Sequence, residues 1–176
     1  PYLRLFLQFF FAIILWFNGI RITEINLDFI GFGNFVFPNF LSLSFTIIWI
    51  SAVINAINWF DGLDGLAAGT TSIICLALFV IAFSFDNVLM TYLLAALTGS
   101  CFGFLRYNTY PSRILMGDCG SYFLGFNLAV ISIFACSSNN LKTNFVSGVI
   151  FLLLPMIDMV YVIFSRLKKG ASPYFP

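Results

Sequence analysis

The sequence predicts an all-α membrane protein, a polytopic helical bundle of about six transmembrane helices with a small non-cytoplasmic hairpin. Hydrophobic residues make up 61% of the 176 residues and charged residues only 9%. The resulting mean hydropathy of +1.01 is far above that of a soluble domain. The apolar stretches are also long enough to cross about 30 Å of hydrocarbon, at roughly 17 to 25 residues each. We expect one integral membrane domain over residues 1–176, truncated at both ends.

Polar breaks divide the sequence into the individual spans. The predicted spans are residues 3–20, 41–59, 66–85, 88–105, 121–136 and 145–164. The fifth span is short and must borrow residues from its flanks. Residues 21–40 partly alternate polar and apolar side chains before glycines and a proline, which predicts a small hairpin at the interface. Small residues, among them Ala95, Gly99 and Gly103, predict close helix packing of the fourth span.

The distribution of basic residues predicts which loops face the cytoplasm, because cytoplasmic loops carry the excess of Lys and Arg. If the loops after the second, fourth and sixth spans are inside, the cytoplasmic basic residues are Arg4, Arg106, Arg113, Arg166, Lys168 and Lys169. Only Arg21 and Lys142 then lie outside. In the same orientation Asp61, Asp64 and Asp118 all belong to the cytoplasmic face.

The available residue types restrict the chemistry. The chain has no histidine, which is the usual proton carrier and metal ligand near neutral pH. Its four cysteines are scattered, without the CxxC spacing of a zinc site. Eight Lys and Arg nearly balance seven Asp and Glu, and no run of like charge suits nucleic acid. We therefore expect chemistry based on carboxylates and no nucleic-acid partner.

The first candidate site surrounds the end of the second span. Its polar residues recur at every third position, as Asn55, Asn58, Asp61 and Asp64. On a helix such residues lie roughly on one side, with a drift of about 60° at each step. A glycine follows each carboxylate, where a missing side chain lets a ligand approach the backbone. A solvated helix end is the alternative, but it does not explain two asparagines inside an apolar span.

The second candidate site lies at the start of the fifth span. Asp118 stands between two glycines there, which suits a hard cation that itself holds phosphate oxygens. The alternative for Asp118 is an N-cap of the fifth span. Arg113 is equally explained as a phosphate partner and as a positive-inside residue. Three aspartates at one face repel one another, and Mg²⁺ would remove that repulsion, so the residues indicate phosphate chemistry on the cytoplasmic side.

Both segments resemble signatures of one enzyme family. The run NAINWFDGLDGLAAG is similar to the Asn-x-x-Asn-x-x-Asp-Gly-x-Asp-Gly-Leu-Ala motif of the polyprenyl-phosphate N-acetylhexosamine-1-phosphate transferases, glycosyltransferase family 4. The run RILMGDCGSYFLGF is similar to that family's Met-Gly-Asp-x-Gly-Ser segment. The resemblance covers the chain nearly end to end, as a central fragment. An upstream aspartate pair and a downstream histidine-rich loop of the family are not in this sequence, so we expect the fragment alone to be inactive.

The resemblance implies an activity and its partners. A sugar-1-phosphate, N-acetylhexosamine-1-phosphate, would pass from a UDP-sugar to polyprenyl phosphate with release of UMP, in cell-envelope polysaccharide synthesis. The implied partners are polyprenyl (undecaprenyl) phosphate, a UDP-N-acetylhexosamine and the lipid bilayer, with a homodimer as a further candidate assembly. The implied location is the inner (plasma) membrane, with the active face toward the cytoplasm.

The resemblance also implies a role for each polar residue of the two segments. Asp61, Asp64 and Asp118 would be catalytic. Asn55, Asn58, Asn108 and Arg113 would bind substrate, with Asn108 a candidate for contacting the uridine. Asp118 and Asn58 would ligate Mg²⁺, for which Mn²⁺ is the alternative.

Two other functions compete with this interpretation. Phospho-N-acetylmuramoyl-pentapeptide transferase activity belongs to the same family, although Arg113 and the ending Ser172-Pro173 look more like the branch that uses UDP-N-acetylglucosamine. A cation-coupled transporter belongs to a different class. It should distribute polar groups through the membrane midplane, whereas this chain gathers its aspartates at one face.

Overall fold

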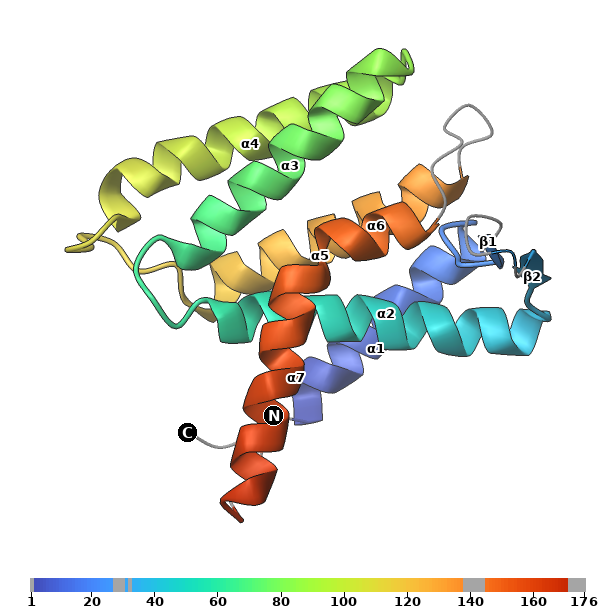
Figure 1. Cartoon of the computed structure of the whole chain (residues 1–176), viewed down its shortest axis with the longest axis horizontal. Coiled ribbons are helices and arrows are strands. Elements are labelled where there is room, and N and C mark those ends of the chain that lie inside the picture. The colour runs from blue at the N-terminus through green and yellow to red at the C-terminus, as the bar shows by residue number, and fades with distance from the viewer. Residues whose placement is uncertain (1, 27–30, 32, 138–144, 171–176) are drawn as a thin grey trace.

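The computed structural model describes residues 2–26, 31, 33–137 and 145–170, so Lys142 and Ser172-Pro173 lie outside the described residues. The elements in chain order are α1 (Tyr2–Phe17), β1 (Glu24–Asn26), β2 (Asn34–Val36), α2 (Asn39–Phe60), α3 (Leu66–Ser84), α4 (Val88–Asn108), α5 (Gly117–Ser137), α6 (Phe145–Phe151) and α7 (Leu153–Lys168) (Figure 1). Within the described residues, α2, α3, α4 and most of α5 are long and apolar enough to cross a membrane, and α1 is a shorter apolar helix. The predicted polytopic helical membrane protein is confirmed.

The predicted hairpin is also confirmed. Strands β1 and β2 pair antiparallel, with Glu24 opposite Val36 and Ile25 opposite Phe35. The backbone N–H of Ile22, just before β1, donates to the Thr46 side chain on α2 at 3.1 Å. The hairpin is therefore attached to α2 near its N-terminal end, far from the loops over residues 61–65 and 109–116 (Figure 1).

The sixth predicted span is not one continuous helix. It divides at Leu152 into α6 and α7, and α7 leaves the bundle in a different direction (Figure 1). Pro155 lies in the first turn of α7, where a missing N–H is tolerated because N–H groups in the first turn have no carbonyl acceptor within the helix. In the middle of a continuous helix the same proline would remove a hydrogen bond, so the break is consistent with its position.

Helix α2 is the centre of the bundle and packs against α1, α5 and α7. Its contact with α5 is unusually close at Gly125, where an added Cβ would lie only 2.8 Å from the Cα of Ile54. The Trp49 indole on α2 also donates to the Ser132 hydroxyl on α5 at 2.9 Å. These contacts fix α5 against α2, and polar residues lie where α2 ends and α5 begins.

Helices α3 and α4 form an antiparallel pair that packs mainly on itself. On α3 the small residues Ala67 and Ala68 are fully buried. On α4, however, Gly99 and Gly103 are exposed, and a Cβ added at either would meet no atom within 4 Å in the described part of the chain. The prediction that the small residues of α4 pack closely is therefore wrong within the described residues.

Candidate active site

Two loops meet at one end of the bundle and form the candidate site. Residues 61–65 connect α2 to α3, and residues 109–116 connect α4 to α5 (Figure 1). Asn108, which is only 3% exposed, joins them. Its side-chain oxygen accepts from the backbone N–H of Gly65 at 3.0 Å, and its amide nitrogen donates to the carbonyl of Ile114 at 2.8 Å. Asn108 thereby uses both ends of its amide to hold the loops together.

A polar cavity of about 190 Å³ lies between these loops. It is lined by Asp61, Gly62, Leu63, Asp64, Asn108, Leu115, Met116 and Gly117. Asp64 is exposed and accepts from the backbone N–H of Ser112 at 3.0 Å, so it adds a second link between the loops. Asp61 is the more buried of the two loop carboxylates.

The carboxyl group of Asp61 is electrostatically perturbed. Partial burial and, second, the negative charge of Asp118 raise the pKa of Asp61, while a hydrogen bond from the backbone of Gly117 opposes that rise. Asp61 and Asp118 therefore lie close enough to repel one another when both are ionised. A cation shared by the two carboxylates would relieve this repulsion.

The Asp118 side chain is held by residues from two other helices, α1 and α2. It lies in the first turn of α5, which begins at Gly117, so it is not the N-cap that the alternative interpretation required. The Asn58 amide nitrogen on α2 donates to Asp118 Oδ1 at 3.1 Å and to the buried Ser121 hydroxyl at 2.9 Å. Arg4 Nη1 on α1 forms an ion pair with Asp118 Oδ2 at 2.6 Å. Asn58 and Arg4 thus each hold one oxygen of the carboxylate.

Arg4 is a functional candidate that sequence reasoning missed. Its Nη1 also donates to the Tyr122 hydroxyl at 3.2 Å, and its guanidinium carbon lies 5.9 Å from the centroid of that ring. The positive-inside rule already explained a basic residue at this position, so there was no separate reason in the sequence to assign Arg4 a role in the site. One sequence feature could have indicated a polar face on this span, because Arg4 and Gln8 are one helical turn apart among apolar residues.

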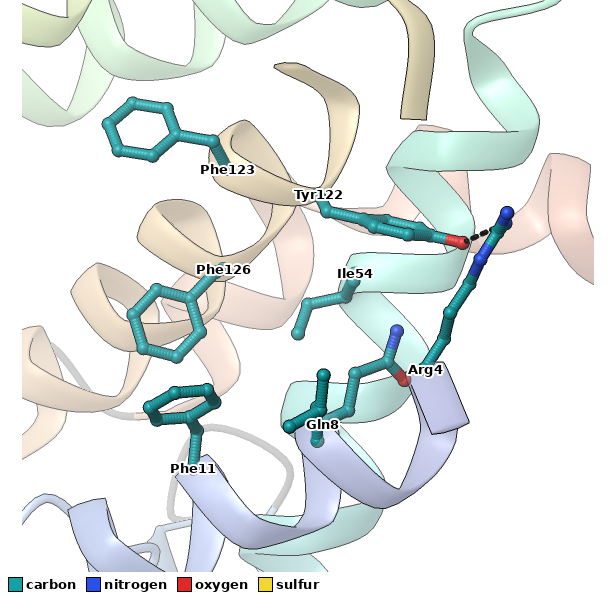
Figure 2. Close-up of a pocket in the computed structure, with 8 residues that line it drawn as sticks. Arg4, Gln8, Phe11, Ile54, Tyr122, Phe123 and Phe126 are labelled. Atoms are coloured by element: carbon teal, nitrogen blue, oxygen red, sulfur yellow. Dashed lines mark hydrogen bonds between the residues drawn. The ribbon is translucent and has the colours of Figure 1, made fainter. Parts of the chain in front are cut away.

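Arg4 stands at one end of an apolar pocket of about 330 Å³ between α1, α2 and α5. Figure 2 shows Arg4 reaching toward Tyr122 at one side of the view, with Phe11, Phe123 and Phe126 at the opposite side. The lining residues are Arg4, Leu7, Gln8, Phe11, Ile54, Tyr122, Phe123 and Phe126. We call this the α1–α5 pocket. Its lining is almost entirely apolar beyond Arg4 and Gln8, so it suits a hydrocarbon chain with an anionic end.

The structure separates the polar residues that were expected on one side of a helix. Because α2 ends at Phe60, only Asn55 and Asn58 are helical, and Asp61 and Asp64 belong to the following loop. The Asn55 amide points to α1 and donates to Gln8 at 3.0 Å, and Asn55 does not line the polar cavity.

Arg113 is also away from the cavity lining. Its side chain is exposed, and its backbone N–H donates to the carbonyl of Tyr107 at 2.8 Å. Among the residues that the structure describes, no three His, Cys, Asp or Glu side chains gather as a metal site. The structure therefore brings Asn58, Asp61 and Asp118 to one end of the bundle without forming a three-carboxylate centre.

Fold and site define an integral membrane protein with an acidic loop site beside an apolar pocket. Residues 1–136 match the family described as glycosyl transferase family 4. The chain belongs to this family. That membership argues against the transporter interpretation, in agreement with the gathering of Asp61 and Asp118 at one end of the bundle.

Three curated relatives illustrate the range of the similarity. A probable undecaprenyl-phosphate N-acetylglucosaminyl 1-phosphate transferase of Bacillus subtilis is 38% identical over 122 residues, covering 69% of this chain and 34% of the relative. A phospho-N-acetylmuramoyl-pentapeptide-transferase of Trichormus variabilis is 38% identical over 181 residues, covering 97% of this chain and 46% of the relative. A decaprenyl-phosphate N-acetylglucosaminephosphotransferase of Mycobacterium leprae is 33% identical over 165 residues, covering 83% and 42%. The chain spans about a third to a half of the length of these relatives.

Proposed function

We propose that the protein transfers N-acetylhexosamine-1-phosphate from a UDP-sugar to polyprenyl phosphate and releases UMP. An oxygen of the polyprenyl phosphate would attack the sugar-linked phosphorus, and the pyrophosphate bond to UMP would break. The observation that carries this proposal is the Arg4–Asp118 ion pair of 2.6 Å. Arg4 lines the apolar pocket, and Asp118 follows directly on Gly117 of the polar cavity, so a lipid site and a phosphate site adjoin.

The α1–α5 pocket supports the assignment of the lipid substrate. The first isoprene units of the carrier would enter between Phe11, Ile54 and Phe126, where they lose contact with water and gain van der Waals contacts. The phosphate would then lie near Arg4, whose planar guanidinium suits phosphate oxygens. This arrangement explains a positive charge at the end of an otherwise apolar pocket.

The polar cavity supports the assignment of the nucleotide sugar. Asp61 is the partly buried carboxylate there, and the glycine-rich loop lets a ligand approach the backbone closely. Asn108 was a candidate for contacting the uridine. Its amide is engaged by Gly65 and Ile114, so we propose that it acts by holding the walls of the cavity in place.

The residues present fit a magnesium ion. Asp61 and Asp118 are two mutually repelling carboxylates, and Mg²⁺ binds through one or two carboxylates together with waters and substrate phosphates. When bound, the ion would neutralise charge on the pyrophosphate and on the leaving UMP. Asn58 turns its amide nitrogen toward Asp118, so in this arrangement it positions the carboxylate. For Asn58 to be a ligand, its amide would have to turn over; Mn²⁺ would suit the same oxygens.

The location of the active face is part of the proposal. Arg4 and Asp118 lie in contact, and Arg106 lies in the last turn of α4, which leads into the second loop of the site. Basic residues therefore accompany the acidic site at one end of the bundle, as expected for the cytoplasmic side of an inner membrane. The homodimer remains an expectation to be measured.

A transfer assay tests the proposal. The protein, expressed from its complete coding region in membranes, would be incubated with radiolabelled UDP-N-acetylglucosamine, undecaprenyl phosphate and Mg²⁺. We expect a lipid-soluble product and UMP, both of which depend on the lipid phosphate. UDP-N-acetylmuramoyl-pentapeptide would be tested in parallel, because a relative that matches 97% of the chain is named for phospho-N-acetylmuramoyl-pentapeptide transfer. Release of UDP, or no product with either donor, would contradict the proposal.

A further inference from the structure

We infer that Arg4 and a divalent cation compete for Asp118, so that entry of the cation releases Arg4 to bind the lipid phosphate. This inference rests on the proposed function and assigns Arg4 two alternating partners, Asp118 and the lipid phosphate. Its basis is the occupancy of both Asp118 oxygens, Oδ1 by the Asn58 amide at 3.1 Å and Oδ2 by Arg4 at 2.6 Å. A cation that binds Oδ2 meets the guanidinium at the same oxygen, and the two positive charges repel one another.

The ion pair is suited to such an exchange. The side chains of Arg4 and Asp118 are 57% and 53% exposed. Water screens exposed pairs of this kind, which change an equilibrium constant by no more than about fivefold. The pair is therefore strong enough to reduce the affinity of Asp118 for a cation and weak enough to be broken by one.

Tyr122 determines where the released arginine would go. Arg4 Nη1 donates to the Tyr122 hydroxyl at 3.2 Å as well as to Asp118. Both Arg4 and Tyr122 line the α1–α5 pocket (Figure 2). After displacement, the guanidinium keeps its tyrosine partner and stays at the polar end of the pocket, with N–H groups available to a phosphate. Cation and lipid phosphate should then bind cooperatively, and each should raise the affinity of the other by the same factor.

Binding of Mn²⁺ without substrate measures the competition directly. Electron paramagnetic resonance would count free Mn²⁺ in titrations of the complete protein in detergent. Arg4→Gln should bind Mn²⁺ about three- to fivefold more tightly than the wild type, and Arg4→Lys should bind it nearly as the wild type does. Arg106→Gln is the matched control, since it removes one positive charge from the same end without a contact to Asp118. Equal Mn²⁺ affinity in Arg4→Gln and wild type would overturn the inference.

A second measurement needs no variant. The Mn²⁺ titration of the wild type would be repeated with farnesyl phosphate, a short isoprenoid phosphate. We expect Mn²⁺ to bind about fivefold more tightly, at the lower end of typical coupling between sites, and farnesyl phosphate to gain the same factor from Mn²⁺. No gain in either direction, or no binding of Mn²⁺ at all, would refute the competition. Failure to release UMP from either donor would instead refute the proposed function, while a shifted Mn²⁺ affinity would still support the exchange.

Discussion

Replacing Gly125 by alanine tests whether the contact between α2 and α5 builds the site. A Cβ at residue 125 would lie 2.8 Å from Ile54 Cα, 3.2 Å from Ile54 O and 3.3 Å from Val53 O. All three are backbone atoms and cannot rotate away. Alanine in a helix is favoured over glycine by about 1 kcal/mol, but overpacking a close contact costs about 1–3 kcal/mol. We therefore expect Gly125→Ala to lower the free energy of unfolding by up to about 2 kcal/mol.

The same change should reach the site, because the 3.1 Å hydrogen bond from Asn58 to Asp118 crosses from α2 to α5. Unfolding in detergent can be followed with a thiol-reactive dye, since Cys75 and Cys101 are buried. Gly99→Ala is the matched control, because its Cβ would meet no atom within 4 Å in the described chain and the helix should gain stability. If the two variants were equally stable, the close α2–α5 contact would not be the reason for a glycine at residue 125.

Three further substitutions test the loops and the lipid pocket. Asp61→Asn should raise the melting temperature at pH 7, because the pKa of Asp61 is raised in the fold and its ionisation costs stability; the gain should disappear as the pH falls toward the ordinary value of 3.8. Asn108→Ala should lower the free energy of unfolding by about 1–3 kcal/mol, since it leaves the Gly65 N–H and the Ile114 carbonyl without their side-chain partner. Asn127→Ala is the control and should lower it less, because it loses only a bond within its own helix. Leu7→Trp should fill the pocket and raise the KM for polyprenyl phosphate alone, while Leu41→Trp, at a similarly exposed position outside the pocket, should not. An unchanged KM in Leu7→Trp would contradict the lipid assignment.

The sequence was most informative where the membrane itself sets the structure. Apolar length predicted the helices over residues 41–59, 66–85 and 88–105 to within a few residues, because the hydrocarbon thickness restricts their length. The break before α7 was missed although Pro155 lies inside the predicted span, since length alone does not show where a helix turns. The exposed Gly99 shows the same limit, because a small residue permits close packing without supplying a partner.

The site was predicted in part. Spacing and topology predicted that Asp61, Asp64 and Asp118 share one face, and in the structure the charge of Asp118 contributes to the raised pKa of Asp61. Periodicity also suggested that Asn55 shares their surroundings. Asn55 lies about one helical turn before Asn58, however, and its side chain contacts Gln8 on α1. The contact of Arg4 with Asp118 joins residues 114 positions apart. No local pattern encodes that contact, because it depends on how α1 and α5 each pack against α2.

The central claim is that Asp118 serves a UMP-releasing transfer to polyprenyl phosphate. The most direct measurement compares UMP release by the wild-type protein, expressed from its complete coding region, with that of Asp118→Asn at saturating Mg²⁺. Loss of a group that organises charge in a transition state typically costs about 10²–10³ in rate, so we expect the variant to lose nearly all UMP release. Asp86→Asn, which changes an exposed aspartate in the turn between α3 and α4, should keep normal turnover. Near-normal turnover in Asp118→Asn would contradict the account and remove Asp118 from the metal site.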